Sequence, residues 1–125
     1  PQGELAPQGR LEAYPNWNDF NRNLFDMLNT RILNLSTSVK RVFRTQHISY
    51  MLETDFVDVV IENERLLLRV KMKFQEIVDP DGRFRDIVAI SNRNNGGVEV
   101  VLHNENRLDD VMAIIEQAFR LQEEE

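Results

Sequence analysis

With 125 residues, 42% of them hydrophobic and 29% charged, the chain has the length and composition of one globular domain and not of a disordered segment. It contains no cysteine, which excludes a disulfide framework and a thiolate zinc site and makes a reducing cytoplasm the expected location. The net charge of −6 comes almost wholly from residues 94–125, so no general polyanion-binding composition is present. No apolar stretch approaches the roughly 20 residues of a membrane-spanning helix.

Residues 1–15 hold three of the four prolines and no periodic apolar pattern, so we expect a linker or flexible N-terminal segment. Because the chain begins at Pro1 without an initiator Met, we expect it to be a piece of a longer polypeptide. After Asn16 or Asn18, either of which can cap a helix, apolar residues recur with a helical period. They are Trp17, Phe20, Leu24, Met27, Leu28, Ile32 and Leu35. This pattern predicts a first helix that ends before Ser36.

The centre of the chain predicts strands. Residues 40–51 are rich in β-branched and aromatic types and predict one strand. Residues 55–62 and 65–74 predict two more, joined into a hairpin by the two-residue loop Asn63-Glu64.

The length of that loop fixes the register of the hairpin. It places Asp58 opposite Arg69 and Glu62 opposite Arg65, while apolar residues lie opposite one another at the alternate positions. One face is then wholly apolar and the other carries opposite-charge pairs, each worth about 0.2 to 1 kcal/mol.

The C-terminal half predicts a turn at residues 79–82, a short strand at 87–90, a loop at 92–97 and a strand at 98–102. A final helix follows, for which Asn106 is the expected cap, with Asp109 completing a box-like pair. Its expected buried stripe is Leu108, Val111, Met112, Ile115 and Phe119.

The order of these elements lacks βαβ alternation, which favours an antiparallel sheet. We therefore predict a single α+β domain over residues 16–122, followed by an acidic tail at 123–125. Its mostly antiparallel sheet of about four to five strands would have an N-terminal and a C-terminal helix packed on one face.

Several motifs from about Gln46 to Gln122 carry a family resemblance. They are Ile48-Ser49-Tyr50, Phe56-Val57-Asp58-Val59, Asp79-Pro80-Asp81-Gly82-Arg83, Arg85-Asp86-Ile87, Val98-Glu99-Val100 and Leu108-Asp109-Asp110-Val111-Met112. In order and spacing they resemble an uncharacterised prokaryotic domain family labelled "predicted transport protein". Its members are usually C-terminal modules beside restriction-endonuclease-like or defence-associated nuclease domains, so the resemblance implies an accessory module. The family's Gly-His-Trp-Gly-Asn-Gly loop is Ser91-Asn92-Arg93-Asn94-Asn95-Gly96 here, without the His and the Trp.

No catalytic constellation stands out. A restriction-type nuclease needs an Asp on one strand and an acid-x-Lys on the next; Asp58 and Lys71 fit, but Arg69 stands at the acidic position and cannot ligate a cation. The acidic segment 79–86 has alternate carboxylates but lacks the closing Glu of an EF-hand, so we expect a turn and not a calcium site. We predict no metal site and no cofactor.

The two histidines are also expected to have structural or surface roles. Neither His47 nor His103 lies beside a Ser or Cys in an elbow-type motif, so the sequence indicates no hydrolytic triad.

Basic residues of the central region are the remaining candidates for binding. Four of them share one face of a predicted strand, and three more lie in the following turns and loop. They are Arg65, Arg69, Lys71 and Lys73, and then Arg83, Arg85 and Arg93; Lys40, Arg41 and Arg44 precede them in the same central region. The competing interpretation is a solvated face, on which Asp58 and Glu62 neutralise their neighbours across the hairpin.

The resulting functional hypothesis is a non-catalytic binding or assembly module of a larger prokaryotic nuclease-associated or phage-defence protein. It would contact nucleic acid or a partner protein through the exposed sheet face or the loop at residues 91–97. The alternatives are an enzyme, either a divergent Mg²⁺-dependent nuclease or a small-molecule hydrolase, and a structural domain that forms a homodimer.

Overall fold

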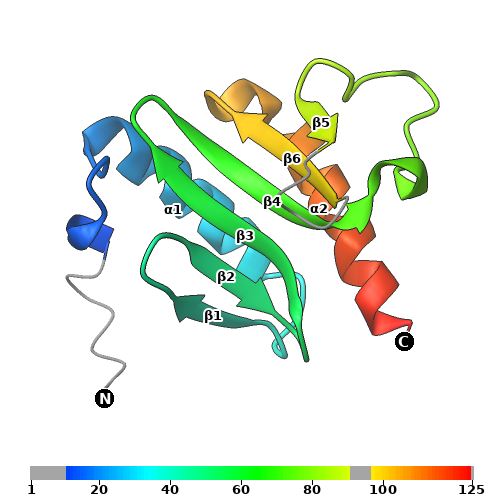
Figure 1. The fold of residues 1–125 in the computed structure, drawn as a ribbon, viewed down its shortest axis with the longest axis horizontal. Helices are drawn as coiled ribbons and strands as arrows, with labels where there is room; N and C mark the ends of the chain where they lie inside the picture. The colour runs from blue at the N-terminus through cyan, green and yellow to red at the C-terminus, as the bar shows by residue number, and fades with distance from the viewer. Residues whose placement is uncertain (1–10, 91–96, 125) are drawn as a thin grey trace.

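The computed structural model describes residues 11–90 and 97–124, which form two α-helices and six strands (Figure 1). The helices are α1 (Asp19–Leu33) and α2 (Leu108–Glu123). The strands are β1 (Lys40–Phe43), β2 (Ile48–Met51), β3 (Asp55–Glu62), β4 (Arg65–Lys73), β5 (Val88–Ile90) and β6 (Gly97–Leu102). Short 3-10 helices are η1 (Leu11–Ala13), η2 (Phe74–Glu76) and η4 (Glu105–Arg107).

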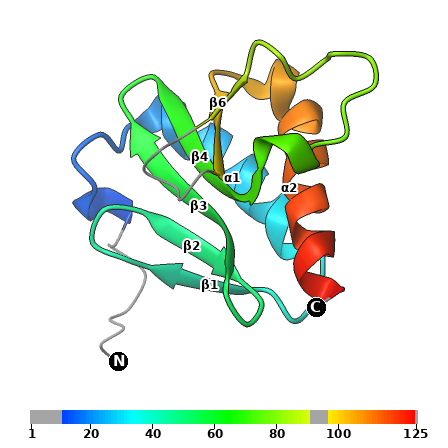
Figure 2. The same cartoon turned by 45° about the vertical axis from the view of Figure 1, so that its right-hand side comes forward.

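The strands form one antiparallel sheet in the order β1-β2-β3-β4-β6-β5. Both helices lie behind this sheet in Figure 1, and the turned view in Figure 2 places them on the same side of it. The predicted α+β class and antiparallel sheet are thus confirmed. The expected four to five strands are too few, because the described residues contain six.

The extra strand comes from residues 40–51, which were expected to form one strand and instead form the hairpin β1–β2. The polar stretch from Arg44 to His47 turns the chain, and the Arg44 N–H donates to the His47 carbonyl at 2.8 Å. With no apolar side chain to add to the core, these four residues are better placed in a turn than in a continuous strand.

The predicted register of the β3–β4 hairpin is confirmed. Asp58 lies opposite Arg69, Glu62 opposite Arg65, and Val59 opposite Leu68. The apolar alternation therefore directs one face of this hairpin toward the helices.

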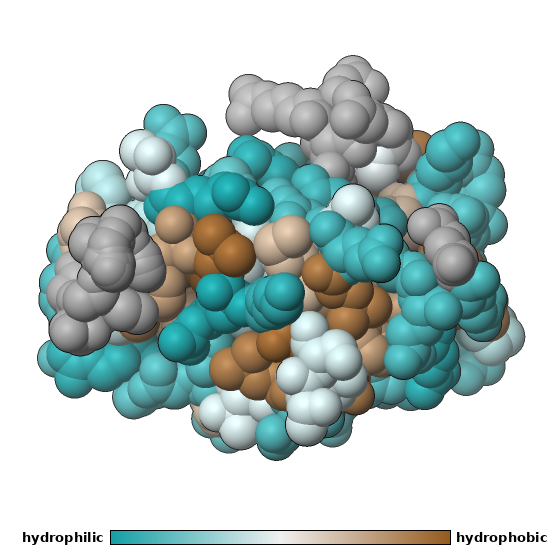
Figure 3. All heavy atoms as spheres, turned by 90° about the horizontal axis from the view of Figure 1, so that it is seen from below, coloured by the Kyte–Doolittle hydropathy of each residue, from teal (hydrophilic) through white to brown (hydrophobic). Residues whose placement is uncertain are grey.

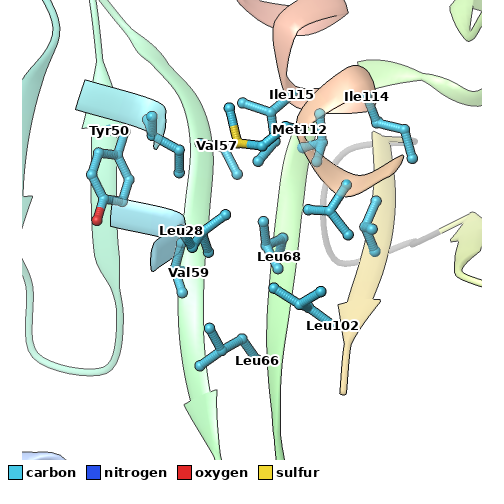
Figure 4. Close-up of a cluster of buried hydrophobic side chains, with 14 of the residues drawn as sticks. Leu28, Tyr50, Val57, Val59, Leu66, Leu68, Leu102, Met112, Ile114 and Ile115 are labelled. Atoms are coloured by element: carbon cyan, nitrogen blue, oxygen red, sulfur yellow. The ribbon is translucent and has the colours of Figure 1, made fainter. Parts of the chain in front are cut away.

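The core lies between the sheet and the two helices. In Figure 4, Leu28 of α1 and Met112 and Ile115 of α2 point toward the alternate residues of the central strands, among them Val59 and Leu68. All five side chains are 1% exposed or less. The predicted stripe of the last helix is confirmed, since its members Leu108, Val111, Met112, Ile115 and Phe119 are all buried.

The start of α1 is tied to the β3–β4 hairpin. Asn18 is the N-cap, its side chain accepting from the Asn21 N–H at 2.9 Å, so the second of the two predicted caps is the correct one. The buried Asn21 amide then donates to the carbonyls of Asn16 at 2.6 Å and Glu62 at 3.2 Å. These bonds satisfy a polar group that would otherwise be costly to bury.

The packed structure begins before residue 16. Tyr14 is buried, and its hydroxyl donates to the carbonyls of Arg44 at 2.7 Å and His47 at 3.0 Å. Part of the segment that composition marks as a linker, from Leu11 to Tyr14, therefore lies against the β1–β2 turn.

The predicted cap of the last helix is wrong. Asn104 caps the short helix η4, its side chain accepting from the Asn106 N–H at 2.9 Å, and α2 continues from η4 with Arg107 at the N-cap position. Both Asn residues have the right chemistry, and the preceding 3-10 turn moves the cap two residues upstream.

The surface beside β1 is mixed in character. Figure 3, which views the molecule from below, shows apolar residues interrupted by hydrophilic ones. Among the described segments, none of the helices is long and apolar enough to cross a membrane.

Candidate functional site

The sheet face away from the helices, called the open face below, carries a row of polar side chains. Cross-strand pairing aligns Ser49 of β2, Asp58 of β3, Arg69 of β4 and Glu99 of β6 in neighbouring positions. Each lies at a position that alternates with the core residues of its strand. The strand register thus brings together residues that are up to 50 positions apart in sequence.

Asp58 is the centre of this arrangement. It is only 5% exposed although no described helix covers this face. Its Oδ1 accepts from the Ser49 hydroxyl at 2.8 Å, and its Oδ2 lies 3.1 Å from Lys71 Nζ and 3.7 Å from His47 Nε2. Ser49 is itself fully buried and accepts from Arg44 Nε at 2.9 Å. A buried carboxylate held by a cation and a hydroxyl is compensated on both oxygens.

A β-bulge brings a second carboxylate into the same cluster. Tyr50 pairs with Val57, but the next residue of β2 pairs with Asp55, so Phe56 is an extra residue on β3. Phe56 consequently packs against Phe119 of α2, with ring centroids 5.4 Å apart, whereas Asp55 lies on the open face 3.6 Å from Arg44 Nη2.

The two carboxylates have opposite pKa shifts. Burial alone would raise the pKa of Asp58, but the hydrogen bonds from Ser49 and Lys71 outweigh it and lower that pKa. Burial raises the pKa of Asp55, and the hydrogen bond and negative charge of the adjacent Asp58 raise it further. In this pair Asp58 is therefore the carboxylate that keeps its charge, and Asp55 is the one that is protonated first.

The cluster does not have the geometry of a hydrolytic triad. A triad needs the imidazole between the hydroxyl and the carboxylate, so that it can take the hydroxyl proton. Here Ser49 donates directly to Asp58, and His47 contacts the other oxygen of the same carboxylate.

The geometry is equally unfavourable for a restriction-type metal site. The two carboxylates of the polar row, Asp58 and Glu99, flank Arg69, whose Nε lies 3.8 Å from Glu99 Oε2. A guanidinium thus stands between the two acids where a cation would have to bind. Within residues 11–90 and 97–124, no three acidic or histidine side chains come together as a metal-binding group.

The sequence-predicted basic residues divide into two groups. Arg65, Arg69, Lys71 and Lys73 lie on the open face by the alternation of β4. The first three form ion pairs, with Glu62, Glu99 and Asp58 respectively. The expected neutralisation across the hairpin therefore occurs, although Asp58 pairs with Lys71 and not with Arg69, which lies directly opposite.

The other predicted residues lie elsewhere. Arg83 pairs with Asp110 of α2 at 2.7 Å, and Arg85 lines a pocket beyond the end of β4. The sheet does not bring these two to the open face. Arg93 and the rest of the loop at 91–96 lie outside the described residues.

Sequence reasoning missed Ser49 and Asp55 as members of the cluster, and it considered Arg44 only as one of the basic residues of the central region. Ser49 was detectable in principle, because a small polar residue between Ile48 and Tyr50 interrupts an otherwise apolar strand. Asp55 was not, since strict alternation from Asp58 assigns it to the opposite face and only the bulge reverses that assignment.

The acidic segment 79–86 is a turn, as expected. Both oxygens of Asp79 accept backbone N–H groups, from Arg83 at 2.8 Å and from Phe84 at 3.1 Å. Asp86 is paired with Arg107 at 2.8 Å, and this hydrogen bond lowers its pKa. These acids therefore serve the turn and its link to η4.

Comparisons with known proteins give a family but no activity. The family model described as "Domain of unknown function (DUF5655)" matches residues 13–122. An uncharacterised protein of Haemophilus influenzae is 22% identical over 102 residues, which cover 82% of this chain and 34% of the relative. The chain thus spans about a third of that relative's length. No solved structure matches.

Proposed function

The chain belongs to the DUF5655 family, and we propose that this member is a non-catalytic binding module that contacts nucleic acid through the open face of its sheet. The observation that carries this proposal is the distribution of charge. The chain as a whole has a net charge of −6, yet basic residues outnumber acidic ones on the open face.

Six basic side chains share this face by strand register: Lys40, Arg44, Arg65, Arg69, Lys71 and Lys73. Four acidic side chains accompany them: Asp55, Asp58, Glu62 and Glu99. Within the described residues the open face therefore has two positive charges in excess. A surface of this kind attracts phosphate groups in a salt-dependent way without reading the base sequence.

The position of these cations also supports the proposal. Lys40 and Lys73 are exposed, and Arg44 is 44% exposed at its side chain despite its contact with Asp55. Arg69 is held only loosely, since its buried Nε makes no hydrogen bond and lies 3.8 Å from Glu99. Phosphate oxygens can thus reach donors on β1, on the β1–β2 turn and on β4 without disrupting the core.

The absence of catalysis is part of the proposal. Its support is the geometry of the polar row, in which Arg69 separates the two carboxylates and Ser49 donates to Asp58 and not to His47. We further propose that this module belongs to a larger nuclease-associated or defence protein. In support of a larger protein, the chain matches only 34% of its Haemophilus influenzae relative.

The experiment measures the affinity of the chain for fluorescent oligonucleotides at several salt concentrations. The test variant is Lys40→Glu with Lys73→Glu, which reverses two exposed charges on the open face. The control is Arg22→Glu with Arg120→Glu, which makes the same change in net charge on the two helices, where these side chains are 55% and 67% exposed. We expect the test variant alone to lose affinity and to reduce the salt slope by about two.

Equal losses in the two variants would show that net charge, and not the open face, governs binding. Cleavage of the oligonucleotide with Mg²⁺ that Asp58→Ala abolishes would replace the proposal with a nuclease. A stable dimer that binds no oligonucleotide would favour a structural role.

A further inference from the structure

A pocket of about 310 Å³ lies beyond the end of β4, outside the open face. Its walls come from three segments, namely η2 (Phe74–Glu76) with the following Ile77, the turn at residues 79–85 and the start of β5. In Figure 1 these segments follow one another along the right-hand side of the molecule. Phe74, Ile77, Phe84 and Val88 supply apolar surface, Arg85 supplies a positive charge, and Asp79 supplies a carboxylate whose two oxygens accept backbone N–H groups.

Phe74 is an unusual wall residue because it is large, aromatic and 47% exposed. It directly follows β4, where the chain leaves the sheet and turns into η2. The ring therefore gains less from burial than the core aromatics do, and it offers a flat apolar surface to a ligand.

Arg85 lies against the glycine of the turn. Gly82 has a φ of +66°, a backbone conformation that favours glycine, and a Cβ at this residue would lie 2.9 Å from Arg85 Nη2. The Arg85 guanidinium is therefore packed over the turn at the edge of the pocket.

Arg85 forms no ion pair with the acids of its own segment. Both oxygens of Asp79 are used by backbone N–H groups, and Asp86 pairs with Arg107. No ion pair joins Arg85 to any residue in the described part of the chain. An anionic group at the pocket would therefore meet an available partner.

We propose that this pocket takes one unstacked base of a single-stranded nucleic acid, with the base against Phe74 and the neighbouring phosphate on Arg85. The inference rests on the proposed function and specifies its ligand. An aromatic ring beside a cation is the combination with which proteins bind single strands, since a base exposes its flat face only when it leaves the duplex.

The pocket adjoins the open face through one residue. Lys73, the last residue of β4, precedes Phe74 and is among the open-face cations. A strand whose phosphates lie along the open face would thus pass Lys73 before its base reaches Phe74.

The test compares a single-stranded oligonucleotide with a duplex of equal length and the same sequence. The variants are Phe74→Ala and Arg85→Gln. The matched control is Phe20→Ala, because Phe20 on α1 is 49% exposed and is not part of this pocket. Wild-type protein should prefer the single strand, and Phe74→Ala should weaken single-strand binding by about tenfold. Its affinity for the duplex should be unchanged.

A 5-iodouracil oligonucleotide gives an independent readout, since irradiation should crosslink it to Phe74 in a form that mass spectrometry locates. Arg85→Gln should lower the salt slope for the single strand by about one and leave that for the duplex unchanged.

If Phe74→Ala keeps the single-strand preference, or if Phe20→Ala loses it equally, the pocket inference fails while the open-face proposal stands. If wild-type protein binds neither oligonucleotide, both fail.

Discussion

The two faces of the sheet are stabilised by different means. The face toward α1 and α2 is apolar, and its central residues such as Leu68 and Val59 are completely buried. The open face also contains a buried residue, Asp58, but there it is compensated by Ser49 and Lys71. The core face stabilises the fold by removing apolar surface from water. On the open face, ion pairs and hydrogen bonds only offset the cost of burying charged and polar groups. Residues of the open face are accordingly more available for binding.

The largest expected effect tests this contrast with two adjacent leucines of β4. Leu68→Ala, on the helix side, should lower the free energy of unfolding by about 3 kcal/mol, because it leaves a cavity in the core. Leu67 lies on the open face, outside the core cluster that contains Leu68, so Leu67→Ala should cost less. Urea denaturation gives both values. Equal costs would mean that the open face is as well packed as the core.

Removal of the central carboxylate should have the next largest effect. Asp58→Ala should destabilise the chain by about 2 kcal/mol, since it removes the carboxylate that accepts from the buried Ser49 hydroxyl and pairs with Lys71. The cost stays below that of a fully buried pair because the Lys71 side chain is 31% exposed. Glu62→Ala, which breaks the more exposed pair with Arg65, is the control and should cost about 0 to 1 kcal/mol. A cost below that of the control would contradict a structural role for Asp58.

The acid pair should give stability a pH dependence with two opposite slopes. The ordinary pKa of both carboxyls is 3.8. The lowered pKa of Asp58 contributes stability above pH 3.8 that is lost as the pH falls through its folded-state pKa. The raised pKa of Asp55 contributes stability below pH 3.8 that is lost as the pH rises through its folded-state pKa.

Asp55→Asn should therefore remove the decline above pH 3.8, while Asp19→Asn, an exposed control on α1, should keep it. Each slope corresponds to at most one proton, and unfolding curves measured on both sides of pH 3.8 separate the two. A decline that survives in Asp55→Asn would assign the shift to another group.

The smallest effect is expected from the exposed open-face cations. The Lys40→Glu and Lys73→Glu variant used for binding should change the free energy of unfolding by less than about 0.5 kcal/mol, because both side chains are exposed. A thermal melt beside the binding curves checks this. A larger loss of unfolding free energy would mean that these cations stabilise the core as well, against the contrast between the two faces.

Much of the core face was predictable from sequence because its signals are local. The Asn63-Glu64 loop and the alternation around it were enough to align Val59 with Leu68, and the helical period was enough to identify the buried stripe of α2. These features depend on neighbouring residues, which is where sequence patterns are most informative.

The cluster on the open face was less predictable, since it depends on partners from different strands. Asp58 and Glu99 both lie on the same face as Lys71 and Arg69. Only the structure shows that Lys71 pairs with Asp58 and Arg69 with Glu99. Glu99 lies on β6, whose place beside β4 follows from no local pattern. The pocket at Arg85 likewise depends on the fold of the turn around Gly82.

The extra residue at Phe56 limits which changes in chain length the protein can accept. Loss of one residue between Met51 and Asp55 would favour strict alternation, in which Asp55 would turn toward Phe119 and the aromatic ring of Phe56 toward water. Insertions and deletions in related chains should therefore be rare in this stretch. We expect them instead in the exposed connection at residues 37–38, where a change in length does not alter which side chains face the core.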